Sequence, residues 1–350
     1  MKFPTTSYWT ARNNWQVRDV GLTEWLLKDE QCLPFDVADT TAPVVTPELS
    51  GEALKLLESE VENGNRVLIV SNTVRRCQDI AKAVRKHFPN AICFHSKFTF
   101  DDRNRLEKLI TEDDSTVQIL VATQVVEVSL DIDFDLLMTE CAPIDALVQR
   151  AGRINRARKT EPGNVVVFQA EENSDKIYDY PEGVLQRTWD LLTETNGLLT
   201  ENRLLELVEA AYQGYDLRED DSFKRVQSKV LTQQSRLSGV LDNPRPYEED
   251  SDLTTRLIDY PQISVIPDID NFVQAVHSEA CTPKDRRRHE LKMPLWYVKT
   301  VDDMGNPYGR FDDELFVHFC QMEYDPVFGG TFLPARISGS AVSDPSNFIF

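Results

Sequence analysis

The stretch that decides the fold of this chain is VATQVVEVSLDIDFD at Val121–Asp135, followed after a second apolar run by QRAGRINR at Gln149–Arg156. The first stretch continues a short apolar strand into a polar loop. The second contains Arg153 and Arg156 after Gly152. Because residues three apart share one face of a helix, both guanidinium groups can reach one polyphosphate. The pattern therefore indicates part of a motor that is driven by a nucleoside triphosphate.

No phosphate-binding loop accompanies these arginines. A P-loop reads G-x-x-x-x-G-K-[ST], and none of the 14 glycines is followed by lysine. The magnesium-holding pair of helicases would read D-E-x-D or D-E-x-H, and neither Asp-Glu step, at Asp29 and at Asp313, fits. No histidine is followed by aspartate, which excludes a metal nuclease of the HD type. The sequence therefore predicts half of an ATPase site.

Apolar runs that alternate with helix-like segments extend outward on both sides of these motifs. We expect strands at 66–71, 91–94, 117–122, 136–139 and 164–168, separated by helices at 52–63, 74–87, 102–111 and 145–151. Short, nearly continuous apolar strands of this kind lie in a buried parallel sheet. Ligands bind such sheets at the carboxyl ends of the strands. The pattern predicts a doubly wound α/β domain over residues 50–170.

The flanking regions are less regular. Residues 1–49 are punctuated by four prolines and are typical of a linker or of the remnant of a preceding domain. Residues 171–350 contain, in order, a helical stretch at 185–215 broken at Asn196-Gly197, a charged segment at 218–252, and strand-like stretches at 295–301 and 315–324. We expect this part of the chain to form a smaller helical or α+β region.

The composition sets limits on the class of protein. The net charge is −20, but global charge does not decide what a local groove binds. The apolar runs are too short to span a bilayer and the N-terminus has no apolar export segment, so we expect a cytoplasmic protein without a membrane partner. The six cysteines contain no C-x-x-C pair, and we expect no structural metal.

These motifs resemble, in order and spacing, the C-terminal RecA-like domain of a superfamily 2 helicase. They are most similar to the signature helicase-nuclease of type I CRISPR interference. The resemblance rests on LIVSNTV at Leu68–Val74, HSKF at His95–Phe98 with Asp102-Arg103, VATQVVEVSLDID at Val121–Asp133, and APIDALVQRAGRINR at Ala142–Arg156. It covers residues 50–170. Tyr324-Asp325-Pro326 and Gly329-Gly330 also resemble the C-terminal region of that family.

The resemblance implies a role for each motif. Arg153 and Arg156 would contact the γ-phosphate of ATP, and the residues implied at the nucleotide beside them are Asp131, Gln149 and Gly152. The residues implied at the nucleic-acid backbone are Thr73, His95, Ser96, Lys97, Arg103 and Thr123. Arg103 is equally suited to an ion pair on the surface of its helix. Glu127 is expected to hold the loop after its strand.

The resemblance implies the C-terminal half of an ATP-dependent helicase that translocates on single-stranded DNA in type I CRISPR antiviral defence. Its implied partners are single-stranded DNA, a P-loop-bearing RecA-like domain or subunit that also holds magnesium, and the CRISPR interference complex. We expect the chain to begin between the two motor domains and to be inactive alone. Two alternatives stay open: a non-catalytic module that binds nucleic acid or a complex, and a superfamily 2 remodeller outside CRISPR.

Overall fold

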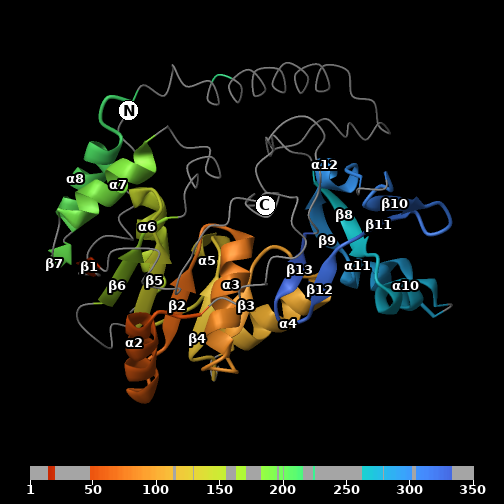
Figure 1. Cartoon of the computed structure of the whole chain (residues 1–350), viewed down its shortest axis with the longest axis horizontal. Helices are drawn as coiled ribbons and strands as arrows, with labels where there is room; N and C mark the ends of the chain where they lie inside the picture. Colours follow the sequence, from red (N-terminus) through yellow and green to blue (C-terminus); the bar gives the residue numbers. More distant parts are fainter. Residues whose placement is uncertain are drawn as a thin grey trace, which may run out of the picture.

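The computed structural model of the chain describes residues 15–19, 48–112, 116–128, 130–154, 163–170, 183–194, 197–199, 201–215, 224, 262–278, 280–301 and 305–332. These residues contain a seven-stranded sheet, a four-stranded sheet and a two-stranded hairpin. The seven-stranded sheet lies toward one end of the molecule and the four-stranded sheet toward the other (Figure 1).

The larger sheet has the strand order β3-β4-β2-β5-β6-β1-β7. Its strands are β1 (Trp15–Asp19), β2 (Val67–Val70), β3 (Ile92–Phe94), β4 (Ile119–Ala122), β5 (Leu136–Glu140), β6 (Gly163–Phe168) and β7 (Gly197–Leu199). Neighbouring strands are parallel except β7, which runs antiparallel to β1. All residues of β2, β4 and β5 are buried. The expected buried parallel sheet is therefore confirmed.

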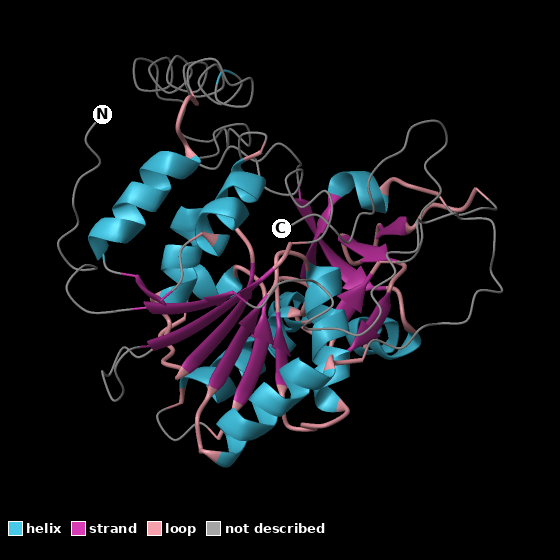
Figure 2. Ribbon diagram, turned by 60° about the vertical axis from the view of Figure 1, so that its left-hand side comes forward, coloured by secondary structure: helices cyan, strands magenta, loops and turns pink. Residues whose placement is uncertain are grey.

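Helices cover both faces of this sheet (Figure 2). One hydrophobic core joins one face to α2 (Gly51–Glu62) and α3 (Val74–Arg85). A second core joins the other face to α4 (Phe100–Thr111), α5 (Val125–Val128), α6 (Ile144–Ala151), α7 (Val184–Thr193) and α8 (Glu201–Ala211). Ser50, Thr73 and Thr99 cap the amino ends of α2, α3 and α4, which fixes where each helix begins. The doubly wound architecture is confirmed.

Strand β1 extends the sheet beyond the stretch that the motifs cover. It pairs with β6 over five residue pairs, although the sequence indicates a linker or a domain remnant over residues 1–49. The division of the chain at residue 50 therefore stays a prediction. The expected break in the 185–215 stretch is confirmed, because β7 separates α7 from α8.

The C-terminal region is α+β, as expected. Its four-stranded sheet has the order β10-β11-β8-β9, and β12 pairs with β13 in a separate hairpin. The strands are β8 (Gln262–Pro267), β9 (Leu291–Pro294), β10 (Gly309–Asp312), β11 (Val317–Cys320), β12 (Glu323–Asp325) and β13 (Gly329–Thr331). The helices are α10 (Asp270–His277), α11 (Pro283–Arg288) and α12 (Leu295–Val298).

The prediction of a strand-like stretch at 295–301 is wrong. Residues 295–298 form the helix α12, which begins directly after the strand β9. The run Leu-Trp-Tyr-Val is apolar throughout, so its pattern does not distinguish a short buried strand from a buried helical turn. Tyr297 and Val298 are buried in the core of this region. The charged segment 218–252 lies outside the described residues except for Lys224.

Candidate nucleotide and nucleic-acid interface

The loops after strands β2, β4 and β5 meet at the carboxyl edge of the large sheet. Gln124, after β4, donates from Nε2 to the Asn72 carbonyl at 2.7 Å. Asn72, after β2, donates from Nδ2 to the carbonyl of Cys141, after β5, at 2.8 Å. The motifs that are distant in the sequence are thus joined by direct hydrogen bonds. This is the edge at which parallel α/β sheets bind ligands.

Arg150 lies at the centre of this edge, with a fully buried side chain. Its Nε donates to Glu127 Oε1 at 2.8 Å. Its Nη1 donates to Thr139 Oγ1 at 2.9 Å and to the Glu140 carbonyl at 3.0 Å, and its Nη2 donates to Asn72 Oδ1 at 3.0 Å. One planar guanidinium therefore fastens α5 and α6 to the ends of β2 and β5. We call these five residues the arginine network.

A second buried arginine adjoins the network. The Nε atom of Arg76 lies 3.5 Å from Glu140 Oε2, and both side chains are at most 1% exposed. The same carboxylate oxygen accepts a hydrogen bond from the Asn72 backbone N–H at 2.7 Å. Burial raises the pKa of Glu127, while the guanidinium of Arg150 opposes this shift by favouring the carboxylate. Two arginines thus face two carboxylates, so each buried charge has an opposite charge beside it.

Arg153 lies just beyond the carboxyl end of α6 and holds the loop after α5. Its Nη1 donates to the Leu130 carbonyl at 2.8 Å, and its Nη2 donates to the Glu127 carbonyl. The Arg153 carbonyl accepts a hydrogen bond from the N–H of Phe134 at 3.0 Å. The structure therefore brings Arg153 to the segment that carries Asp131.

The other residues implied at the nucleotide lie near this point. Asp131 follows the loop and is exposed, and Gln149 is exposed on α6. Gly152 is the residue at which α6 ends. Arg156 lies outside the described residues, and its role stays a prediction. The contact of these residues with a nucleotide is likewise a prediction that rests on the resemblance.

The two threonines implied at the nucleic acid are enclosed at strand ends. Thr73 is fully buried and its hydroxyl accepts the Arg76 backbone N–H at 3.1 Å, which caps α3. Thr123 is 3% exposed and its backbone N–H donates to the Phe94 carbonyl at 3.3 Å. Their hydroxyls are therefore enclosed in the folded chain. The role of both residues at a nucleic acid stays a prediction.

Ser96 and Arg103 are more accessible. Ser96 is half-buried, and Arg103 on α4 donates from Nε to Glu107 at 2.8 Å. The ion pair that the sequence allows for Arg103 is therefore present. Because this pair joins neighbouring turns of an accessible helix surface, it is weak enough to exchange for a phosphate contact.

His95 and Lys97 lie beneath the β12–β13 hairpin. The Nε2 atom of His95 lies 2.8 Å from the Phe328 carbonyl, and His95 Nδ1 accepts the Lys97 backbone N–H at 3.1 Å. This pattern assigns the ring proton to Nε2. Lys97 donates from Nζ to the Lys292 carbonyl at 2.9 Å. Burial lowers the pKa of His95 to about 3 and the pKa of Lys97 to about 7.

The hairpin is fastened to the α/β domain by several hydrogen bonds. Gln78 on α3 donates from Nε2 to the carbonyls of Phe328 at 2.8 Å and Gly330 at 3.1 Å. Tyr324 donates from its hydroxyl to Asp102 Oδ2 on α4 at 2.6 Å. Residues of the Tyr-Asp-Pro and Gly-Gly motifs therefore contact the α/β domain and join the C-terminal region to it.

We expect Gly329→Ala to lower the free energy of unfolding by roughly 2–4 kcal/mol, because left-handed strain and steric overlap add. Gly329 has φ +75°, and a Cβ atom there would lie 2.6 Å from His95 Cε1. Gly64 has φ +77° with open space around it, so Gly64→Ala is the matched control and should cost about 1 kcal/mol. Denaturant unfolding measures both variants. Equal losses would show that the hairpin does not press against His95.

We expect the protein to lose stability as the pH falls below 6.5, because of His95. Its pKa falls from 6.5 to about 3 on folding, so between these values the unfolded chain binds a proton that the folded chain does not. The stabilisation is complete above the unfolded value and is lost as the pH falls toward the folded value. Thermal unfolding at several pH values measures this loss. It should shrink in His95→Gln and persist in His87→Gln, which alters an exposed histidine.

Sequence reasoning missed the role of Arg150, Arg76 and Glu140. A usable signal exists for Arg150, since it lies three residues after Leu147 and four after Ala146, both of them buried on α6. Helical spacing therefore assigns Arg150 to the buried face. An arginine on a buried face requires polar or charged partners. Those partners lie at strand ends, and the sequence does not show which strand ends lie side by side in the fold.

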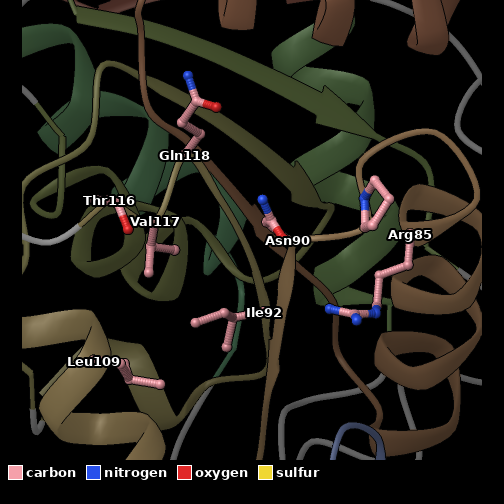
Figure 3. A pocket seen from close by; sticks show the side chains of 8 residues that line it. Arg85, Asn90, Ile92, Leu109, Thr116, Val117 and Gln118 are labelled. Atoms are coloured by element: carbon pink, nitrogen blue, oxygen red, sulfur yellow. The ribbon is translucent and has the colours of Figure 1, made fainter.

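A cavity of about 800 Å³ lies at the opposite edge of the sheet (Figure 3). It is lined by Arg85, Pro89, Asn90, Ile92, Leu109, Thr116, Val117 and Gln118. Ile92 begins β3, and Val117 and Gln118 precede β4. The cavity is therefore separate from the arginine network, and no residue of the candidate site lines it.

Two classes of feature are absent from the part of the chain that the structure describes. Its helices include none that is both long enough and apolar enough to cross a bilayer. Within the same ranges, no three or more His, Cys, Asp and Glu side chains are grouped so that they could hold a metal ion.

The sequence of this chain is similar to those of several known proteins. Residues 63–159 match the family model described as CRISPR-associated nuclease/helicase Cas3, C-terminal. A putative CRISPR-associated nuclease/helicase Cas3 of Myxococcus xanthus is 41% identical over 144 residues, which are 39% of this chain and 19% of that protein. The CRISPR-associated endonuclease/helicase Cas3 of Escherichia coli K12 is 38% identical over 109 residues, 28% of this chain and 12% of that protein. The chain thus spans a minor part of these relatives.

Solved structures agree on the fold. The crystal structure of T. fusca Cas3 with AMPPNP superposes with a TM-score of 0.57 at 18% identity, over 92% of this chain and 42% of that one. The RecA-like assignment of the parallel sheet is therefore confirmed. The residues matched by the family model fit a C-terminal helicase domain of Cas3.

Proposed function

We propose that this chain, whose residues 63–159 fit a Cas3-like C-terminal helicase domain, is the C-terminal half of a motor that translocates on single-stranded DNA in CRISPR defence. Another RecA-like domain would hold ATP and magnesium. This chain would supply Arg153 and Arg156 to the γ-phosphate as the two domains close. The observation that carries the proposal is that Arg153, just after α6 with its exposed Gln149, donates to the carbonyl of Leu130 beside the exposed Asp131.

The arrangement around Arg153 suits a group that must move. Its Nη1 and Nη2 atoms donate to two backbone carbonyls, those of Leu130 and Glu127. An anionic phosphate is a stronger acceptor for a guanidinium than a neutral carbonyl. We therefore propose that Arg153 rests on the carbonyls of Glu127 and Leu130 in the separate domain and exchanges them for the γ-phosphate when the nucleotide-bearing domain closes.

The arginine network supplies a physical route between the strand-end loops and Arg153. Asn72, which adjoins the proposed nucleic-acid residue Thr73, bonds to Arg150, and Arg150 bonds to Glu127. The Glu127 carbonyl in turn accepts a hydrogen bond from Arg153. A shift of the loop after β2 would therefore reach Arg153 through Arg150 and Glu127. We propose that this chain of contacts couples DNA binding to ATP hydrolysis.

The proposed DNA contacts divide into two groups. Ser96 and Arg103 are accessible, and they would meet phosphates directly. Thr73, Thr123, His95 and Lys97 are at most 3% exposed. These four would shape the loops whose backbone groups face the strand. For His95 and Lys97, a direct contact requires the β12–β13 hairpin to move, because the hairpin covers them.

Related structures support the cofactor and partner proposals. T. fusca Cas3 has been solved with AMPPNP, ATP and ADP. One chain of a CRISPR RNA-guided surveillance complex in a pre-nicking state also superposes, with a TM-score of 0.50 at 18% identity. We propose ATP as the nucleotide, and an interference complex and single-stranded DNA as partners.

ATP hydrolysis by this chain mixed with a separate P-loop-bearing RecA-like polypeptide of the same motor tests the proposal. We expect activity that requires both polypeptides and rises with single-stranded DNA, and little activity from either one alone. If the mixture is inactive while this chain still binds DNA or an interference complex, the chain is a binding module and not half of a motor.

A further inference from the structure

The turn between β10 and β11 displays an aromatic side chain in a strained conformation. Phe316 ends this turn with φ +54°, which makes it the one non-glycine residue with positive φ in the described ranges. A bulky residue with positive φ is strained, and such strain concentrates at sites with a role in binding or catalysis. Phe316 is 79% exposed, so little packing in the folded chain offsets the strain.

The turn is held rigidly in this shape. Asp312 accepts hydrogen bonds through Oδ1 from the backbone N–H groups of Glu314 at 3.1 Å and Leu315 at 2.9 Å. The Leu315 carbonyl accepts a hydrogen bond from Arg286 on α11 at 3.1 Å. Leu315 also packs against the small core of Ile266, Val276 and Phe319. With Leu315 fixed inward, the next side chain is directed outward.

Phe316 belongs to an exposed aromatic cluster. Its ring centroid lies 6.3 Å from that of Phe311, which is 47% exposed, and Phe311 lies 4.8 Å from the ring of His318. We call these three residues the aromatic tip. Exposed aromatic groups on a rigid support are typical of the residues that dominate protein–protein binding energy, because little side-chain entropy is lost on docking.

The two acidic side chains of the turn itself favour one kind of partner. Asp313 and Glu314 are exposed in the same turn, and carboxylates repel the phosphates of a nucleic acid. They are complementary to a protein surface that carries lysine or arginine. A second copy of this chain is disfavoured by its net charge of −20.

The aromatic tip lies away from the candidate ATP site. Strands β10 and β11 lie at the end of the molecule away from the seven-stranded sheet (Figure 1). Arg153 belongs to the part of the chain that carries that sheet, since it follows α6 and donates to the Leu130 carbonyl. The tip therefore faces a partner that binds the outer side of the C-terminal region.

We propose that the aromatic tip docks into an apolar pocket bordered by basic residues on a protein subunit of the CRISPR interference complex. The partner in this inference rests on the proposed function. Phe316 fills the pocket, and Asp313 and Glu314 pair with the basic border. The strain at Phe316 is retained because the side chain is needed for docking.

Phe316→Gly tests this proposal, because it removes the strain and the docking group together. We expect binding to the purified interference complex on target DNA to weaken at least about tenfold, while the midpoint of thermal unfolding stays the same or rises. Phe100→Ala is the matched control, since Phe100 is 56% exposed on α4 and should leave binding unchanged. Glu314→Lys should weaken binding most at low salt.

Other outcomes overturn the proposal. Equal affinity of the wild type and Phe316→Gly, or no binding of the wild type, removes the docking role. Loss of single-stranded DNA binding in Phe316→Gly assigns the tip to nucleic acid, and a change in sedimentation assigns it to self-association. ATP hydrolysis by the two-polypeptide mixture is measured in parallel with the same variant. Its failure with docking retained overturns the proposed motor and not the tip.

Discussion

Arg153→Ala is expected to lower the ATPase rate of the two-polypeptide mixture by about 10³-fold, the lower limit for loss of an arginine that stabilises a transferring phosphoryl group. The reason is electrostatic. Negative charge develops on the γ-phosphoryl oxygens, and a guanidinium in a closed site stabilises that charge without reorganisation of solvent. Arg153 donates a hydrogen bond to the carbonyl of Leu130, the residue that precedes Asp131. Steady-state ATP hydrolysis with saturating single-stranded DNA measures the effect.

Two further variants separate catalysis from folding. Arg153→Lys keeps the charge but loses the planar fork, and we expect most of the rate to be lost while ATP affinity changes little. Arg203→Ala removes an exposed arginine that pairs with Glu206 on α8, and it should leave the rate unchanged. If Arg153→Ala lowers the ATPase rate by less than tenfold, and the variant unfolds at the wild-type temperature, the role of Arg153 is limited to holding Glu127 and Leu130 in place.

Arg150→Ala is expected to lower the free energy of unfolding by about 3–5 kcal/mol, the range for removing one partner of a buried ion pair. The side chain is fully buried and is bonded to Glu127, Thr139, Glu140 and Asn72. Its removal leaves the Glu127 carboxylate, which is 12% exposed, without this opposite charge. Denaturant-induced unfolding of the single variants and of the double variant with Glu127 measures the loss.

The double variant distinguishes a broken charge pair from a lost packing contact. In Arg150→Met with Glu127→Leu both charges are removed, and we expect much of the stability to return. DNA stimulation of ATP hydrolysis should not return with it, because the proposed route from Asn72 to Arg153 is interrupted. Full recovery of that stimulation would contradict the coupling role of the network. Arg203→Ala is again the control and should cost less than about 1 kcal/mol.

Local sequence patterns were sufficient for the layers of the fold. The run Val67–Val70 reads as a strand because all four residues are apolar, and every one is buried. The helix expected at 102–111 begins earlier, at Phe100, because the Thr99 hydroxyl caps its first turn. The pattern was insufficient at 295–298, where an apolar run without a period became α12.

The sequence also predicted one part of the candidate site and not another. The order of the motifs and the polar residues at strand ends predicted a site at the carboxyl edge, where Asn72 and Gln124 form hydrogen bonds between loops. The sequence did not indicate that His95 and Lys97 are covered. Their cover comes from residues about 230 positions away, including Phe328 and Gly330, and no local pattern carries such a pairing.

By itself, the sequence of this chain determined the parallel α/β sheet, its two helical layers and the edge at which the loops after β2, β4 and β5 meet. These features follow from periodicity and from capping chemistry, which act within a few residues. Tertiary structure alone decided that Arg150 is the buried centre of that edge, that the β12–β13 hairpin encloses His95, and that Phe316 is held outward. Each of these depends on which distant groups satisfy a buried donor or fill a space, and that is fixed only when the whole chain has packed.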